Sequence, residues 1–189
     1  MPVPPPPQAS RVFKGILTDV YQWPQVMYDG STRTFECYVR HDTVAVIPFL
    51  DADTVLLTHQ EQPGRSAFWD VPGGRVDDDE TLEQAAVREF HEETGYDAMT
   101  LELWTMRRYE GLSHFEEGIY VAKDLTRGEH GNHDRAGEKI TLHPTPWKEA
   151  LLMAARGQIR RHEVSLALLG MAHDPEQRVR LERFLSRPA

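Results

Sequence analysis

The chain has 189 residues, a formal net charge of −9, 40% hydrophobic residues and 27% charged residues. This length is enough for one domain with a full core, and the composition is ordinary for a globular protein. A diffuse acidic surface repels nucleic-acid backbones, so we expect no stable nucleic-acid partner. Because the sequence lacks an apolar run of about 18 residues, we also expect no membrane span.

The N-terminus and the cysteine content bear on the compartment. Residues 1–10 contain four consecutive prolines and have neither the basic start nor the apolar centre of a secretory signal. We predict that they form a disordered, Pro-rich arm. Cys37 is the only cysteine, so no disulfide can form within the chain. These features favour a cytoplasmic protein.

The first third of the chain predicts β-strands, because it is rich in β-branched and aromatic residues with turn signals between them. The expected strands are residues 12–21, 33–40, 43–49, 54–59 and 68–71. Asp29-Gly30 marks a turn between the first two strands, and residues 51–53 mark the turn of a buried hairpin. We therefore expect an N-terminal β segment at 11–42 and a larger domain at 43–189.

The remainder predicts a helix, more strands, a polar loop and further helices. The first helix is expected from about Thr81 to Thr94, with aspartates at 77–79 as its N-cap and Gly95 at its left-handed end. Strands are expected at 101–108, 118–122 and 140–143, a loop at 126–139, and helices at 147–156, 163–172 and 175–186. Thr145-Pro146 is expected to open the second helix. This order predicts an α+β domain.

Three carboxylates lie on one side of the first predicted helix. At roughly 100° per residue, Glu89, Glu92 and Glu93 fall within an arc of roughly 100°, beside the apolar face. Crowded, partly buried carboxylates repel one another, and Mg²⁺ or Mn²⁺ would offset their charge. Arg88 is placed to pair with one of them. From the residues alone, a solvated Glu-rich helix explains the pattern equally well.

Residues 74–96 resemble the Nudix box, G-x5-E-x7-R-E-U-x-E-E-x-G-U, where U is a bulky apolar residue. Every fixed position matches, at Gly74, Glu80, Arg88, Glu89, Phe90, Glu92, Glu93, Gly95 and Tyr96. The two U positions carry aromatic residues, where aliphatic residues are more usual. The resemblance implies an α/β/α sandwich with a mixed central sheet, and it makes residues 43–189 a Nudix hydrolase domain.

The resemblance also implies a metal site that binds and cleaves a diphosphate. Glu89 and Glu93 would be direct ligands of Mg²⁺ or Mn²⁺, Glu92 a ligand directly or through water, and the Gly73 carbonyl a further ligand. Glu92 and Glu93 would thereby belong to the catalytic group. Gly74 would let the backbone approach the metal. The residues implied to be mainly structural are Glu80, Arg88 and Gly95.

The rest of the chain, from about residue 13 to 170, is similar to the ADP-ribose pyrophosphatase branch of the family. That branch implies a homodimer in which the N-terminal segment reaches the partner and both subunits build the base pocket. Two features depart from it: Pro72-Gly73-Gly74 replaces the usual P-A-G, and no proline occurs between Pro72 and Pro144. We therefore expect a nucleoside diphosphate sugar as substrate, with ADP-ribose as one candidate.

Loop carboxylates are the candidates for the group that accepts the proton of the attacking water. Glu138 matches the position used in this branch best, and the alternatives are Glu129, Asp134, Glu116 and Glu117. Each is also explained as an ordinary solvated acid. The neighbouring His130 and His133 fit a polar loop better than a zinc site, because no cysteine or helical pair accompanies them.

Substrate contacts are expected from an arginine and from aromatic residues. Arg65 is placed to hold a phosphate with two hydrogen bonds, although a surface turn explains it equally well. Trp23, Tyr28 or Phe35 would stack on the base, and each is individually explained by packing. The competing activities are hydrolysis of a nucleoside triphosphate, a dinucleoside polyphosphate or an RNA cap. A non-catalytic sensor of ADP-ribose-like ligands is disfavoured because the box is intact.

Overall fold

The computed structural model describes residues 4–128 and 138–188. The strands are β1 (Ser10–Lys14), β2 (Thr18–Val26), β3 (Thr32–Arg40), β4 (Thr43–Asp51), β5 (Thr54–Glu61), β6 (Phe68–Asp70), β7 (Tyr96–Glu110), β8 (Ser113–Arg127) and β9 (Lys139–Pro146). The helices are α1 (Leu82–Thr94), α2 (Trp147–Ala155), α3 (His162–His173) and α4 (Pro175–Ser186). None of the helices in these described ranges is long and apolar enough to span a membrane.

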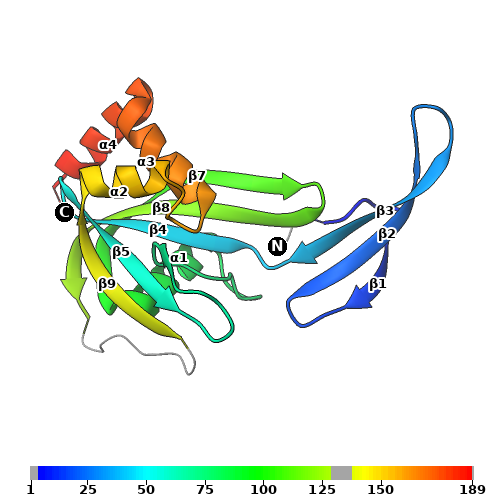
Figure 1. The fold of residues 1–189 in the computed structure, drawn as a ribbon, viewed down its shortest axis with the longest axis horizontal. Coiled ribbons are helices and arrows are strands. Elements are labelled where there is room, and N and C mark those ends of the chain that lie inside the picture. The colour runs from blue at the N-terminus through cyan, green and yellow to red at the C-terminus, as the bar shows by residue number, and fades with distance from the viewer. Residues whose placement is uncertain (1–3, 129–137, 189) are drawn as a thin grey trace.

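The strands form one mixed sheet in the order β1-β2-β3-β8-β4-β5-β6, with β7 paired to β8 and β9 paired to β5. Strands β4 and β8 run parallel, whereas β4 and β5 form an antiparallel hairpin. Helix α1 lies on one face of the sheet and α2, α3 and α4 lie on the other (Figure 1). The predicted α/β/α sandwich with a mixed central sheet is therefore confirmed.

Successive side chains of β4 point to opposite faces of the sheet, so they belong to two separate core clusters. Val44 and Val46 pack with α1, whereas Ala45, Ile47 and Phe49 pack with the cluster under α2, α3 and α4. All five are essentially inaccessible to solvent. A strand that is buried on both faces is a continuous apolar run, and this explains why the sequence TVAVIPF shows no polar alternation. Because β4 is buried on both faces, it is a rigid support for the loop that is hydrogen-bonded to it before α1.

The strands β1, β2 and β3 form the part of the sheet that extends away from the body, and we call this part the N-terminal sheet (Figure 1). It joins the body where Tyr38 and Val39 of β3 pair with Ser113 and His114 of β8. The carbonyl of Pro4 also accepts a hydrogen bond from the His114 ring. Exposed apolar residues of this sheet and its turns are Val12, Phe13, Ile16, Leu17, Val26, Tyr28 and Phe35. The domain boundaries at 10 and 42 stay a prediction.

Several predicted boundaries were wrong for local reasons. The expected strand at 12–21 is two strands, because the chain reverses at Gly15, whose N–H donates to the Thr18 carbonyl. The cap of α1 is Thr81 and not an aspartate of 77–79. Pro146, which has no side-chain donor or acceptor, stands at the N-cap of α2 where Thr145 was expected. The turn at Asp29-Gly30 and the end of α1 at Gly95 are confirmed, with φ of 80° and 68°.

Helix α1 begins with a capping box that fixes its first turn. The Thr81 hydroxyl accepts from the Gln84 N–H at 3.2 Å, and the Gln84 side chain accepts from the Thr81 N–H at 2.8 Å. Ala85, Ala86 and Phe90 then bury the apolar side of the helix against β4 and β8. Because the helix is held at both its start and its face, the side chains beside that face have defined positions.

We expect Thr81→Ala to lower the free energy of unfolding by about 1 kcal/mol, because it removes the oxygen that satisfies a first-turn N–H. Thr81→Ser keeps that oxygen and is the matched control, with stability close to the original protein. Urea unfolding of the three proteins measures the difference. Equal midpoints for the alanine variant and the original protein would contradict the capping role.

Candidate active site

A cavity of about 520 Å³ opens beside α1, between the loop before that helix and the linker from α2 to α3. Its wall combines carboxylates with guanidinium groups. The carboxylates are Asp70, Glu89, Glu93 and Glu138, and the arginines are Arg40, Arg65, Arg75, Arg160 and Arg161. Cations next to buried acids suit a ligand that brings both negative charge and metal.

Glu93 and Gly73 both line the cavity. The Gly73 N–H donates to Glu93 Oε2 at 2.9 Å, which joins the end of α1 to the loop before it. Burial raises the pKa of the Glu93 carboxyl to about 8, and neighbouring Glu89 and Glu138 act in the same direction against Gly73 and Arg161. A carboxyl with such a pKa gains strongly from a cation placed beside it.

The two glycines before the box have separate steric causes. Gly73 has φ of 151°, and a Cβ there would overlap the Val44 carbonyl oxygen of β4. A Cβ on Gly74 would instead overlap the carboxylate of Glu89, which is 4% exposed. Gly73 therefore lets the loop lie against β4, and Gly74 lets the Glu89 carboxylate lie over the backbone. The departure from P-A-G has a structural reason in this chain.

Arg88 links the other acids of the box. Its Nε donates to Glu80 at 3.0 Å, and its Nη1 donates to Glu89 at 2.8 Å and to Glu92 at 3.3 Å. Its Nη2 donates to the Arg75 carbonyl and to Glu80, and the hydrogen bonds to Glu80 and Glu89 raise the pKa of the Arg88 guanidinium. Glu80 in turn accepts from the Asp77 N–H. This network ties the loop before α1 to the helix.

Arg161 is a residue of the cavity that the sequence analysis missed. Its guanidinium donates to the Gly73 carbonyl at 3.1 Å and to the Val71 carbonyl at 3.4 Å, and its Nε lies 3.8 Å from Asp70. Burial opposes its charge, but Asp70, Glu93 and Glu117 raise the pKa of the Arg161 guanidinium. The only signal in the sequence was the Arg160-Arg161 pair before a predicted helix.

Other expected residues divide between the cavity and the rest of the molecule. Arg65 and Glu138 lie on the cavity wall, and Glu138 accepts from the Gln62 side chain at 3.0 Å. Trp23 packs edge-on against Phe35 within the N-terminal sheet, and Tyr28 is fully exposed; none of these three lines the cavity of the same chain. Outside the described residues lie Glu129, His130, His133 and Asp134.

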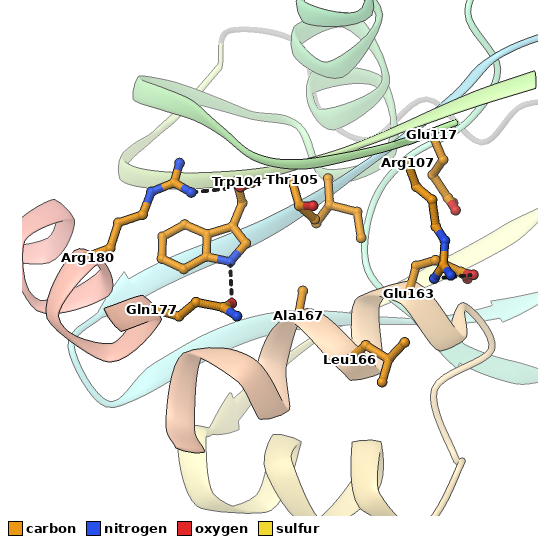
Figure 2. Close-up of a pocket in the computed structure, with 10 residues that line it drawn as sticks. Trp104, Thr105, Arg107, Glu117, Glu163, Leu166, Ala167, Gln177 and Arg180 are labelled. Carbon is orange, nitrogen blue, oxygen red and sulfur yellow. Dashed lines mark hydrogen bonds and ion pairs between the residues drawn. The ribbon is translucent and has the colours of Figure 1, made fainter. Parts of the chain in front are cut away.

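Glu116 and Glu117 lie away from this cavity. Glu116 pairs with Arg108 at 3.8 Å, whereas Glu117 lines a second cavity of about 390 Å³ between β7 and helices α3 and α4. In Figure 2, Glu117, Arg107 and Glu163 stand at one end of this second cavity. Burial raises the pKa of Glu117, and Arg161 opposes that rise, so the two groups are near neighbours. Neither acid lines the first cavity, whereas Glu138 does.

The donors around Gly73 fit a hard divalent cation. Glu89, Glu92, Glu93 and the Gly73 carbonyl offer only oxygen, which Mg²⁺ and Mn²⁺ prefer. Among the described residues no three His, Cys, Asp or Glu side chains already converge on one point. Arg88 donates to Glu89 and Glu92, while the Gly73 N–H donates to Glu93. Glu89 and Glu93 border the cavity together with Gly73, whereas Glu92 does not line it.

The model of the NUDIX domain matches residues 39–167, and the chain belongs to this family. The chain is 28% identical over 93 residues to the ADP-ribose pyrophosphatase of Bacillus subtilis (strain 168), a match that covers 49% of this chain and 50% of that protein. It is 70% identical over 31 residues to a putative 8-oxo-dGTP diphosphatase of the same organism, which covers 16% of this chain and 21% of that protein.

Among solved structures, the crystal structure of an ADP compounds hydrolase matches with a TM-score of 0.71 and 20% identity. The match covers 90% of this chain and 94% of that chain. At this identity the likeness establishes the fold alone. The chain spans half or less of the length of the two Bacillus subtilis relatives, so their activities are not transferred by these matches.

Gly74→Ala is expected to lower the free energy of unfolding by about 1–3 kcal/mol and to weaken Mg²⁺ binding, because its methyl group displaces the Glu89 carboxylate. Gly111→Ala, where a Cβ meets open space, is the matched control. Chemical unfolding and calorimetric Mg²⁺ titration measure the two effects. A Gly74→Ala protein that behaves like the Gly111→Ala protein would refute the role of this glycine.

Glu93 also predicts a pH dependence of stability. Because the pKa of Glu93 is about 8 in the folded protein against an ordinary 4.5, the folded state holds this proton more tightly than the unfolded state. The resulting stabilisation is complete below the ordinary pKa and is lost as the pH rises through about 8. With metal chelated, Glu93→Gln should flatten this decline, whereas Glu182→Gln on α4 should not. An unchanged decline in Glu93→Gln would be inconsistent with the burial of this group.

Proposed function

We propose that the protein hydrolyses the diphosphate bond of a nucleoside diphosphate sugar, with Mg²⁺ or Mn²⁺, to a nucleoside monophosphate and a sugar phosphate. One observation supports this above the others. Glu89 and Glu93 border a single cavity with the Gly73 carbonyl, and five arginines line the same cavity. This is the arrangement that a metal-bound diphosphate needs, because the acids bind the cation and the arginines bind the phosphate oxygens.

Glu89, Glu92, Glu93 and the Gly73 carbonyl would hold the metal. When bound there, Mg²⁺ or Mn²⁺ supplies charge neutralisation on the diphosphate and a lower pKa for the attacking water. Arg88 positions Glu89 and Glu92 by direct hydrogen bonds. Each of these groups lies on α1 or in the loop before it, so the capped helix determines the spacing of the donors.

The remaining residues of the cavity would bind the substrate and move the proton. Arg65 would hold a phosphate oxygen at the wall of the cavity. Water attacks one phosphorus, the bond from that phosphorus to the bridging oxygen breaks, and the departing phosphate keeps the electron pair. Glu138 would accept the proton that the water loses, since its carboxylate is on the cavity wall and is oriented by Gln62. Glu92 and Glu93 would contribute as catalytic ligands.

The choice of substrate class rests on the resemblance to the ADP-ribose pyrophosphatase branch and on the similarity to the Bacillus subtilis enzyme of that name. ADP-ribose is one candidate among nucleoside diphosphate sugars. A homodimer is part of the proposal: the N-terminal segment at 11–42 would bring Trp23 and Tyr28 to the base pocket of a partner subunit. The exposed apolar residues of β1, β2 and β3 support such a contact. The single buried Cys37 supports a cytoplasmic location.

The test is a hydrolysis screen with ADP-ribose, ADP-glucose, GDP-mannose and UDP-glucose in the presence of Mg²⁺. We expect turnover of at least one of them, with the monophosphate and the sugar phosphate as products. Glu93→Gln should lower turnover by about two orders of magnitude or more while the fold is retained. Gly111→Ala, which is remote from the cavity, should keep the original rate.

Two results would contradict the proposal. The first is turnover of a nucleoside triphosphate, a dinucleoside polyphosphate or capped RNA without turnover of any nucleotide sugar. The substrate class would then be that other compound. Near-normal turnover by Glu93→Gln would remove this residue from the metal site. Binding of ADP-ribose without any turnover would instead favour the non-catalytic sensor.

A further inference from the structure

The linker between α2 and α3 is bonded to β6, and Asp70 at the end of this strand lines the cavity. The Arg160 N–H donates to the Trp69 carbonyl at 2.8 Å, and Ile159 forms a parallel bridge with Trp69. Ile159 itself is fully buried in the core. Arg161, the next residue, therefore starts from a backbone position that the sheet determines, and its side chain points from there into the acidic cavity.

The Gly73 peptide is held on both sides. Its N–H donates to Glu93 at 2.9 Å, and its carbonyl accepts from Arg161 Nη2 at 3.1 Å. The same carbonyl is the backbone ligand assigned above to the metal. Only 21% of the Arg161 side chain is exposed, and its partner Asp70 is 3% exposed, so solvent screens this charge weakly.

The charge of Arg161 acts on acids of both cavities. Asp70, Glu93, Glu117 and Glu89 all interact with it. Glu117 does so from the far side, where it closes one end of the cavity shown in Figure 2. A divalent cation at the Gly73 carbonyl would be attracted by the same acids and repelled by the guanidinium at close range.

We propose that Arg161 is a counter-cation built into the site, which shares the Gly73 carbonyl with the metal and so weakens metal binding while it stabilises the metal-free fold. The inference rests on the proposed function, because it takes the Gly73 carbonyl as a metal ligand. Arg161 is thus a positioning residue. It lets the acids stay buried without a metal, and it makes the metal exchangeable.

Calorimetric titration of Mn²⁺ without substrate tests this directly. Arg161→Met keeps an unbranched apolar stem that reaches about as far as the arginine Nε, and it removes the guanidinium with its charge and hydrogen bonds. We expect it to bind Mn²⁺ about tenfold more tightly than the original protein, as for a coupling of ordinary size between two cation sites. Its unfolding temperature should be lower in chelator and should rise more on addition of Mn²⁺.

Arg160→Met is the matched control. Arg160 lies on the wall of the same cavity, but its guanidinium packs over the Phe68 ring at 4.4 Å. If sharing the Gly73 carbonyl is the cause, Arg160→Met should change the Mn²⁺ affinity much less than Arg161→Met. An equal gain in both variants would overturn the inference in favour of a general charge effect.

The remaining outcomes separate this inference from the proposed function. If the original protein binds no Mn²⁺, both the proposed function and the inference are refuted. If the original protein binds Mn²⁺ and Arg161→Met binds it equally or more weakly, only the inference fails. Should Arg161→Met not fold, Arg161→Gln and Arg161→Lys decide. Tighter Mn²⁺ binding by the uncharged Arg161→Gln than by the original protein supports the inference. Mn²⁺ binding by Arg161→Lys that is as tight as by Arg161→Gln, or tighter, overturns it.

Discussion

The structure around the cavity depends on one electrostatic constraint, which is that carboxylates must be buried together without unfolding the loop that joins them. Asp70, Glu89 and Glu117 are each less than 10% exposed, and Glu93 is held against the Gly73 peptide. Acids packed in this way repel one another and lose hydration. Arg88 offsets the charge from the helix side, and Arg161 offsets it from the linker between α2 and α3. The fold has to bring both arginines to the same loop.

The sheet provides the rigidity that makes this possible. The loop before α1 lies against β4, since the Val44 N–H donates to the Gly74 carbonyl and the Val46 N–H donates to the Pro72 carbonyl. Strand β4 is packed on both faces, so it does not yield when charge is added or removed beside it. Glycine at position 73 is what allows the loop to come this close.

The local part of this arrangement was predictable from the sequence, and the long-range part was not. The position of Glu89, Glu92 and Glu93 on one side of the helix follows from helical spacing. The positions of the other matched residues between Gly74 and Gly95 follow from a motif of fixed length. Arg161 meets Gly73 across 88 residues, and its position depends on how the linker pairs with β6, which no periodicity encodes. The break between β1 and β2 was missed for a related reason: the turn at Gly15 interrupts a run whose composition is continuously strand-like.

The N-terminal sheet is the opposite case: its composition predicted strands, but the aromatic residues expected to bind the base do not line the cavity of the same chain. Tyr28 is exposed at the turn between β2 and β3, and Trp23 packs against Phe35 within that sheet, and none of the three lines the cavity. A single copy leaves the cavity with charged groups for phosphates and a metal, but without these aromatic residues. If they recognise the base, they would do so in the cavity of a second copy, since Trp23, Tyr28 and Phe35 do not line the cavity of their own chain. Specificity for the base and catalysis at the diphosphate would then belong to different chains, and a change in the N-terminal sheet would alter substrate preference without touching the carboxylates of α1.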